Sequence, residues 1–147
     1  MDLENLYQEI ILDHYRRPLG KGLVEDYVAE VHHVNPTCGD EITLRISLSE
    51  NSEQLSISYE SQGCSISQAS ASMMFDQIND KNYSSGIVAV EHISAMMQRT
   101  IEPDEDILGD AIALAGVAQY PARVKCALLA WMAWKDAAVI ALARKEG

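Results

Sequence analysis

Three cysteines and an aspartate are the residues whose types and positions suggest chemistry in this chain: Cys38, Asp40, Cys64 and Cys126. Cys38 and Asp40 lie two residues apart in the segment NPTCGD, Cys64 follows a glycine, and Cys126 follows the run PARVK. Thiolates and carboxylates are ligands that zinc accepts in tetrahedral sites, and zinc brings no redox chemistry of its own. Three sulfurs and one carboxylate would therefore suit a single zinc ion.

The spacing of the cysteines alone leaves another interpretation open. The paired Cys-x-x-Cys pattern of zinc fingers and redox motifs is absent, and the odd number of cysteines argues against a disulfide framework. Cysteine is also one of the most frequently buried residue types, so three free core thiols are the alternative. A glycine or proline stands near each cysteine, which places the thiols at turns and favours the functional interpretation.

The surroundings of the cysteines favour reactive thiolates. Cys64 and Cys126 lie near predicted helix N-termini, where backbone N–H groups and the helix dipole stabilise negative charge. The glycines that follow Cys38 and precede Cys64 keep the backbone thin, which would help another molecule to approach the sulfurs. Arg123 and Lys125 are close to Cys126 in sequence and are candidate neighbours of the site.

Alternating apolar residues predict the strands that would position these ligands. The alternation is clear over 41–48 and 54–61 and partial over 27–34, and a hairpin turn is expected at 51–53. An antiparallel meander would put the turn that carries Cys38 and Asp40 at the same end of the sheet as Cys64. A helix packed on that sheet can bring Cys126 to the same end.

Helical periodicity accounts for most of the remaining chain. It predicts a helix over 3–15 and, after a possible N-cap at Ser65 or Ser67, another from residue 65 to 78. A polar loop is expected at 79–86, and further helices at 88–99, 106–119 and 121–144, the last with Pro121 in its first turn. The predicted fold class is α+β, with a three-stranded antiparallel sheet covered by helices in one domain, residues 1–147.

The charge of the chain excludes some classes of partner. The 147 residues include 22 acidic and 11 basic side chains, for a net charge of −11. Such a surface repels phosphate backbones and anionic lipid, so neither nucleic-acid nor membrane binding is expected. The charged N-terminus does not resemble a signal peptide, and no long uninterrupted apolar run is present. We therefore expect a cytoplasmic protein, whose thiols stay reduced.

Five segments together resemble a known family: DHY at 13–15 with Pro18, NPTCGD at 35–40, GCSIS at 63–67, ASASMM at 69–74 and PARVKCA at 121–127. They resemble the U-type iron–sulfur cluster assembly proteins, and the SufU-type branch in particular. IscU-type relatives carry histidine immediately before the third cysteine, where this chain has Lys125. SufU-type relatives have an extra segment between the second and third cysteines, expected here around Ser94 to Gly116. The residues before Gly63 depart from the glycine-richer run of many relatives.

The resemblance implies a SufU/IscU-like fold and a specific role. It implies one Zn²⁺ per chain, bound by Cys38, Asp40, Cys64 and Cys126. It also implies a SufS-type cysteine desulfurase as the partner, a pyridoxal-phosphate enzyme that forms a persulfide on its own cysteine. Cys38 would accept that sulfur, a sulfurtransferase-like role, and pass it toward downstream cluster-assembly proteins.

Other roles remain open at this point. The chain could be a scaffold that binds iron and builds an iron–sulfur cluster on the same ligands, although Lys125 in place of histidine argues against this. A zinc ion that only stabilises the fold is a further alternative. The four histidines are weaker candidates for metal contact, and His14 is a candidate for contact with the partner. His32 and His33 are adjacent, so on a strand they would point to opposite faces.

Overall fold

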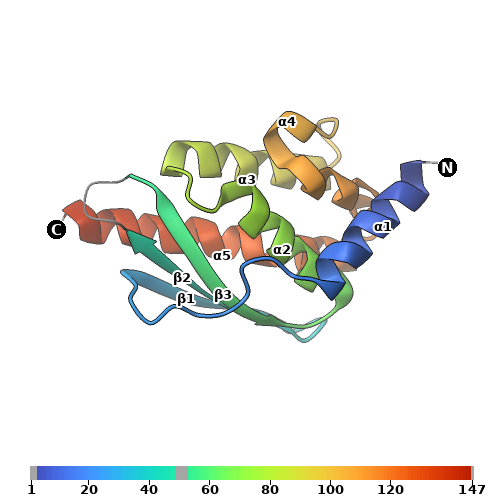
Figure 1. The fold of residues 1–147 in the computed structure, drawn as a ribbon. Helices are drawn as coiled ribbons and strands as arrows, with labels where there is room; N and C mark the ends of the chain where they lie inside the picture. Colours follow the sequence, from blue (N-terminus) through green and yellow to red (C-terminus); the bar gives the residue numbers. More distant parts are fainter. Residues whose placement is uncertain (1–2, 49–52, 147) are drawn as a thin grey trace.

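An antiparallel sheet lies along one side of the molecule, with its strands in the order β1-β2-β3 (Figure 1). The computed structural model describes residues 3–48 and 53–146. The strands are β1 (Ala29–Asn35), β2 (Asp40–Leu48) and β3 (Leu55–Gln62). The predicted meander is confirmed, with strand ends shifted by one or two residues. Most of the turn predicted at 51–53 lies outside the described residues.

The two faces of the sheet differ as the alternation predicts. Ile42, Leu44 and Ile46 of β2 are fully buried, whereas the intervening residues are only half-buried. His32 and His33 lie on opposite faces: the ring of His32 contacts the Thr43 hydroxyl at 2.8 Å, and His33 pairs with Asp136 of the last helix at 3.0 Å. One face of the sheet therefore carries the core.

The helices cover that apolar face. They are α1 (Leu3–Arg16), α2 (Ser65–Ile78), α3 (Tyr83–Met97), α4 (Glu105–Leu108), the 3₁₀ helix η1 (Gly109–Gln119) and α5 (Pro121–Glu146). α5 runs along β1 and β2, while α2 packs beside it and against β3 (Figure 1). The α+β class is confirmed, as are α1, α2 and α5 within two residues of their predicted ends.

Three local predictions were wrong, each for an identifiable reason. The loop predicted at 79–86 ends early because Asn82 caps α3, its side-chain oxygen accepting the Ser85 N–H at 2.9 Å. The helix predicted over 106–119 is divided at Gly109, whose φ of 54° interrupts α4, and the chain continues as 3₁₀ helix. The N-cap of α2 is Cys64, in place of the predicted Ser65 or Ser67.

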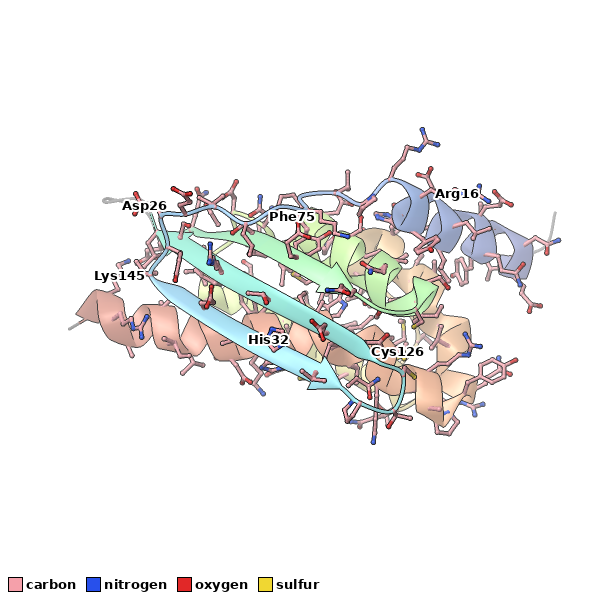
Figure 2. All side chains as sticks on the ribbon, turned by 90° about the horizontal axis from the view of Figure 1, so that it is seen from below. Arg16, Asp26, His32, Phe75, Cys126 and Lys145 are labelled. Atoms are coloured by element: carbon pink, nitrogen blue, oxygen red, sulfur yellow. The ribbon has the colours of Figure 1, made fainter. Side chains whose placement is uncertain are left out.

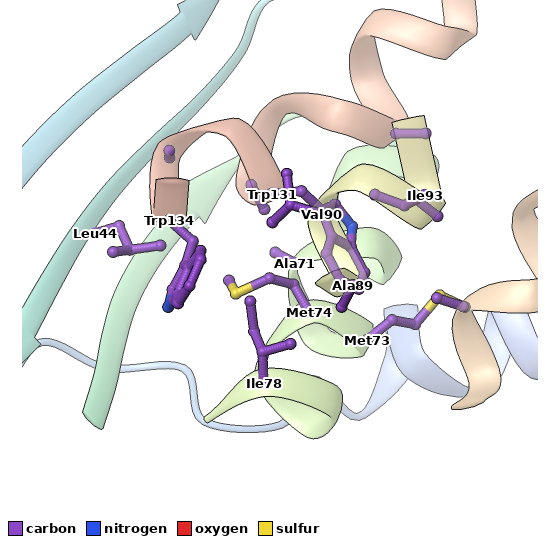
Figure 3. Close-up of a cluster of buried hydrophobic side chains, with 14 of the residues drawn as sticks. Leu44, Ala71, Met73, Met74, Ile78, Ala89, Val90, Ile93, Trp131 and Trp134 are labelled. Carbon is purple, nitrogen blue, oxygen red and sulfur yellow. The ribbon is translucent and has the colours of Figure 1, made fainter. Parts of the chain in front are cut away.

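Two tryptophans of α5 anchor the core between the sheet and the helices (Figure 3). Trp131 and Trp134 are fully buried, and Met73 and Met74 of α2 pack in the same cluster. The Trp131 indole N–H donates to the Ser70 hydroxyl at 2.8 Å. That hydroxyl in turn donates to the carbonyl of Ala127 in α5 at 2.6 Å, so a polar contact fixes α2 against α5 inside an apolar core.

α5 is long and apolar enough to cross a membrane by length and composition alone. Half of its most apolar window is nevertheless buried inside the molecule, against the sheet and α2. Core helices of folded domains satisfy the same test, because an apolar helix that is covered on most sides needs few polar residues. The burial of Trp131 and Trp134 gives this apolar composition a structural explanation.

Gly86 provides a test of the packing between α3 and α5. A methyl group at this position would overlap the ring of Trp134, whereas one at Gly116 would meet no atom within 4 Å. Gly86→Ala should lower the free energy of unfolding by about 1–3 kcal/mol through overpacking. Gly116→Ala is the matched control and should be neutral or stabilising by about 0.4–1 kcal/mol. Chemical denaturation measures both, and equal stabilities would contradict this account of the core.

Candidate metal centre

The four predicted ligands lie where three parts of the fold meet. Cys38 is on the exposed β1–β2 turn, and Asp40 is the fully buried first residue of β2. Cys64 is the half-buried N-cap of α2. Cys126 is in the second turn of α5, where only 1% of its surface is exposed (Figure 2). The hairpin, the start of α2 and the start of α5 thus supply one group of side chains.

Three of these side chains present their donor atoms to a common point. The ligand atoms of Cys38, Asp40 and Cys126 all lie within 4.8 Å of one another. The two thiols also share the Ala122 carbonyl as a weak acceptor, at 4.0 Å from Cys38 and 3.8 Å from Cys126. Cys64 falls outside this group of three, but its thiol lies close enough to affect the pKa values of Asp40 and Cys126.

The Asp40 carboxylate is fixed by hydrogen bonds to both of its oxygens. Oδ1 accepts the Cys64 backbone N–H at 2.9 Å, and Oδ2 accepts the Asn35 amide at 3.2 Å. The Ser67 hydroxyl lies 3.1 Å from Oδ1 and 3.0 Å from the Cys64 carbonyl, and its one hydrogen can serve either acceptor. Asn35 also points its amide at the Cys126 sulfur, at 3.6 Å. Asp40 is therefore the residue to which the rest of the centre is connected.

These bonds decide the charge of Asp40. Burial alone would raise the pKa of the carboxyl, because it penalises the charged form. Hydrogen bonds from the Cys126 thiol, the Cys64 backbone N–H, the Ser67 hydroxyl and the Cys64 thiol together outweigh that effect, and the pKa of Asp40 is lowered. A buried anion therefore stands beside the sulfurs.

Cys126 is shifted in the opposite direction. Burial raises the pKa of its thiol most strongly, and the Asp40 carboxylate and the Cys38 and Cys64 thiols raise it further. At Cys126, desolvation and a neighbouring anion outweigh the favourable effect expected from the helix N-terminus. A cation at this point would reverse the balance, since a metal-bound thiol is deprotonated.

Gly63 has a structural role that was not predicted from the sequence. Its φ of 142° is a backbone conformation that residues other than glycine rarely adopt, and a methyl group there would overlap Asp40. The glycine therefore makes room for the buried carboxylate. Gly39, with a φ of 69°, is on the exposed Cys38 turn, and a methyl group there would meet nothing within 4 Å apart from its chain neighbours.

The two cationic residues predicted as site neighbours, Arg123 and Lys125, are both exposed. Arg123 is exposed and lines a cavity of about 790 Å³ between α1, η1 and the start of α5, together with Tyr7 and Tyr120. Lys125 is exposed on α5.

Sequence reasoning missed Asn35 and Ser67 as supporting residues, although both lie within the segments that carry the family resemblance. Their polar side chains beside predicted ligands were the available signal.

The donor set fits zinc on the chemistry of this chain alone. Two or three thiols and an ionised carboxylate are a borderline-soft set, which suits zinc better than magnesium or calcium. Among the described residues, no histidine belongs to this group of donors. The buried Asp40 charge and the raised pKa of Cys126 are both features that a divalent cation would offset.

The sequence and the fold can now be compared with known proteins. Residues 6–127 match the family model described as the NifU-like N-terminal domain. The chain belongs to this family. The matched segment contains all four predicted ligands and ends one residue beyond Cys126.

Individual relatives agree with this assignment. The chain is 40% identical over 146 residues to the zinc-dependent sulfurtransferase SufU of Bacillus subtilis, covering 99% of this chain and 95% of that protein. It is 40% identical over 135 residues to the iron–sulfur cluster assembly scaffold protein IscU of Streptococcus pyogenes, covering 92% and 84%. The predicted SufU-type resemblance is confirmed.

A solved structure confirms the fold. The SufU protein of Fervidobacterium islandicum, described as a cluster assembly scaffold for the SUF system, superimposes with a TM-score of 0.81 at 32% identity. The alignment covers 93% of this chain and 99% of that one. The predicted SufU/IscU-like architecture is therefore found in a relative across nearly its whole length.

A methyl group added at Gly63 would overlap Asp40, and this gives a test of the candidate metal centre. Gly63→Ala should displace the carboxylate and weaken Zn²⁺ binding to the metal-free protein by at least about tenfold, the scale seen when a supporting group of a metal site is lost. Gly39→Ala strains another position of positive φ, where a methyl group would meet nothing within 4 Å apart from its chain neighbours, and should weaken binding less. Competition with a chromogenic chelator measures both. Unchanged affinity in Gly63→Ala would contradict the role given to Asp40.

Proposed function

We propose that this chain is a zinc-dependent sulfur acceptor in iron–sulfur cluster assembly, taking persulfide sulfur from a SufS-type cysteine desulfurase. The observation that carries the proposal is the contrast between two cysteines of one centre. Cys38 is exposed on a turn and Cys126 is buried, yet their sulfurs and the Asp40 carboxylate lie within 4.8 Å of one another. One thiol can meet a partner while the others remain inside.

The proposed zinc ligands are Cys38, Asp40, Cys64 and Cys126, with one ion per chain. When bound, zinc supplies the positive charge that keeps these thiols deprotonated at neutral pH. Asn35 and Ser67 hold the Asp40 carboxylate in place through hydrogen bonds, as supporting residues do in many metal sites. The name of the Bacillus relative, which is called zinc-dependent, supports the choice of metal.

The proposed sulfur transfer takes place at Cys38. Its thiolate attacks the terminal sulfur of the desulfurase persulfide, a sulfur–sulfur bond forms, and the original persulfide bond breaks. The desulfurase cysteine leaves as a thiolate, and Cys38 carries the sulfur and its proton as a new persulfide. This is thiol–disulfide exchange in form, so no external oxidant or reductant is consumed.

A scaffold function is the second candidate. The 40% identity with the Streptococcus scaffold protein supports it, because a cluster would use the same cysteines. Lys125 precedes the third cysteine where IscU-type proteins carry histidine, which argues against the scaffold. In both candidates, the chain takes part in iron–sulfur cluster assembly with downstream cluster-assembly proteins.

The metal content tests the ligand assignment. The isolated protein should hold about one zinc per chain, bound as tightly as thiolate sites usually are. Cys126→Ala and Cys64→Ala should each lose most of that zinc, because both remove a ligand that the fold holds in place. Lys125→Ala, adjacent to Cys126 but exposed, is the matched control and should keep it. Full zinc in all cysteine variants, measured by elemental analysis, would show that the ligands were wrongly assigned.

The role of Cys38 separates acceptor from scaffold. Cys38→Ala mixed with a SufS-type desulfurase and free cysteine should no longer stimulate turnover, since no thiolate remains to take the sulfur. Thr37→Ala changes an exposed neighbour on the same turn and should stimulate normally. The Cys38 variant should remain folded and still associate with the desulfurase, because protein interfaces are much larger than one thiol.

Mass analysis of alkylated wild-type protein identifies the residue that carries the sulfur. An added sulfur on Cys38 is the expected result. Full stimulation by Cys38→Ala, with persulfide on Cys64 or Cys126, would overturn the role given to Cys38. Wild-type protein that fails to stimulate the desulfurase but assembles a stable cluster from iron and sulfide would favour the scaffold.

A further inference from the structure

A second group of metal-ligating side chains lies apart from the cysteines. His14 of α1, Asp76 of α2 and Asp110 of η1 present donor atoms that all lie within 4.8 Å of one another, and we call them the His14 cluster. They line a cavity of about 310 Å³, which Asp13 and Arg17 also border. Three elements that are far apart in sequence therefore meet at one polar opening.

The imidazole of His14 is held in a fixed orientation. The residue is 6% exposed, and its Nδ1 lies 2.7 Å from the Ser72 hydroxyl, which also accepts the Leu19 backbone N–H at 2.9 Å. Its Nε2 points to the Asp110 carboxylate at 2.9 Å. A metal-bound histidine usually has one ring nitrogen hydrogen-bonded to a supporting group while the other binds the ion, and the Ser72 contact would provide that support here.

We propose that the His14 cluster is a second binding site for a first-row divalent cation. Two ligand atoms that are each about 2.1 Å from one ion stand about 3.0–3.4 Å apart, close to the present distance between His14 and Asp110. Asp76 and Asp110 are exposed, so both carboxylates can move the short distance that closes the site. A cation bound here would connect α1, α2 and η1.

A structural ion pair between His14 and Asp110 explains only part of this arrangement. Within residues 3–48 and 53–146, the Asp76 side chain has no hydrogen-bond or ion-pair partner, yet its carboxylate lies beside the other two donors. The nearby cation Arg17 is already paired with Asp13 at 2.9 Å. Two carboxylates therefore face one imidazole, and a divalent ion would balance them.

The donor types indicate which ions would bind. Carboxylates suit Mn²⁺ and Fe²⁺, imidazole extends the range to Co²⁺ and Zn²⁺, and the absence of sulfur from the cluster separates it from the cysteine centre. Three protein ligands leave the remaining coordination positions to water. The His14 cluster should therefore be a weaker and more exchangeable site than the thiolate centre.

Cobalt titration of the zinc-loaded protein tests this proposal. Co²⁺ should bind as one further equivalent per chain, with weak ligand-field absorption and no thiolate-to-cobalt charge-transfer band. Asp76→Asn removes a ligand charge while leaving the bonds of His14 to Ser72 and Asp110 intact, and should weaken this binding at least about tenfold. Asp106→Asn, an equally conservative change at an exposed aspartate outside the cluster, should bind Co²⁺ like the wild type.

Thermal unfolding provides a readout that is independent of sulfur transfer. Added Co²⁺ should raise the Tm of the wild type and of Asp106→Asn, but not that of Asp76→Asn, because ligand binding stabilises only the folded state that holds the site. Without Co²⁺, all three should unfold at similar temperatures. Failure of the zinc-loaded wild type to take up Co²⁺ outside the thiols would overturn the proposal. So would equal affinity in Asp76→Asn, or a thiolate charge-transfer band that accounts for all the bound cobalt.

Discussion

The buried carboxylate of Asp40 is the constraint on which the candidate metal centre depends. A charge removed from water must be compensated by hydrogen bonds or by a counter-ion, and here the donors come from different parts of the chain. Asn35 closes the hairpin opposite Asp40, and the backbone N–H of Cys64 starts α2. The glycine at position 63 is needed because any side chain there would occupy the space of the carboxylate. The hairpin and the start of α2 are thus tied to each other through one anion.

This arrangement explains why the three cysteines are not equivalent. Cys126 is a buried residue of α5, next to the Asp40 carboxylate. The hydrogen bonds of Ser70 with Trp131 and with the Ala127 carbonyl hold α5 against α2. Cys38 is on a turn outside the sheet ladder, where solvent and partners can reach it. Cys126 is therefore held inside the fold, whereas Cys38 is exposed on its turn.

Much of this could be predicted from the sequence. The clean alternation of β2 and β3 fixed the sheet, and the meander then required Cys38, Asp40 and Cys64 to lie at one end of it. The end of α4 at Gly109 was harder to predict, because the apolar spacing of the sequence continues beyond it into the 3₁₀ helix η1. The raised pKa of Cys126 depends on burial and on Asp40, which no local pattern reveals. Within the His14 cluster, His14 and Asp110 are 96 positions apart, and the Ser72 hydroxyl that contacts the His14 ring is 58 positions from it. No local sequence pattern reveals contacts between residues so far apart.

The length of α5 has a practical consequence for experiments on this protein. A helix rises about 1.5 Å per residue, so its end near residue 146 lies about 30 Å from Cys126. The two ends of the described chain lie on opposite sides of the molecule, and α1 borders the cavity that Arg123 lines (Figure 1). A fluorophore or surface tether attached beyond α5 would leave the cysteines accessible to a partner. The same attachment before α1 would crowd the approach to them, so single-molecule and immobilisation studies should use the α5 end.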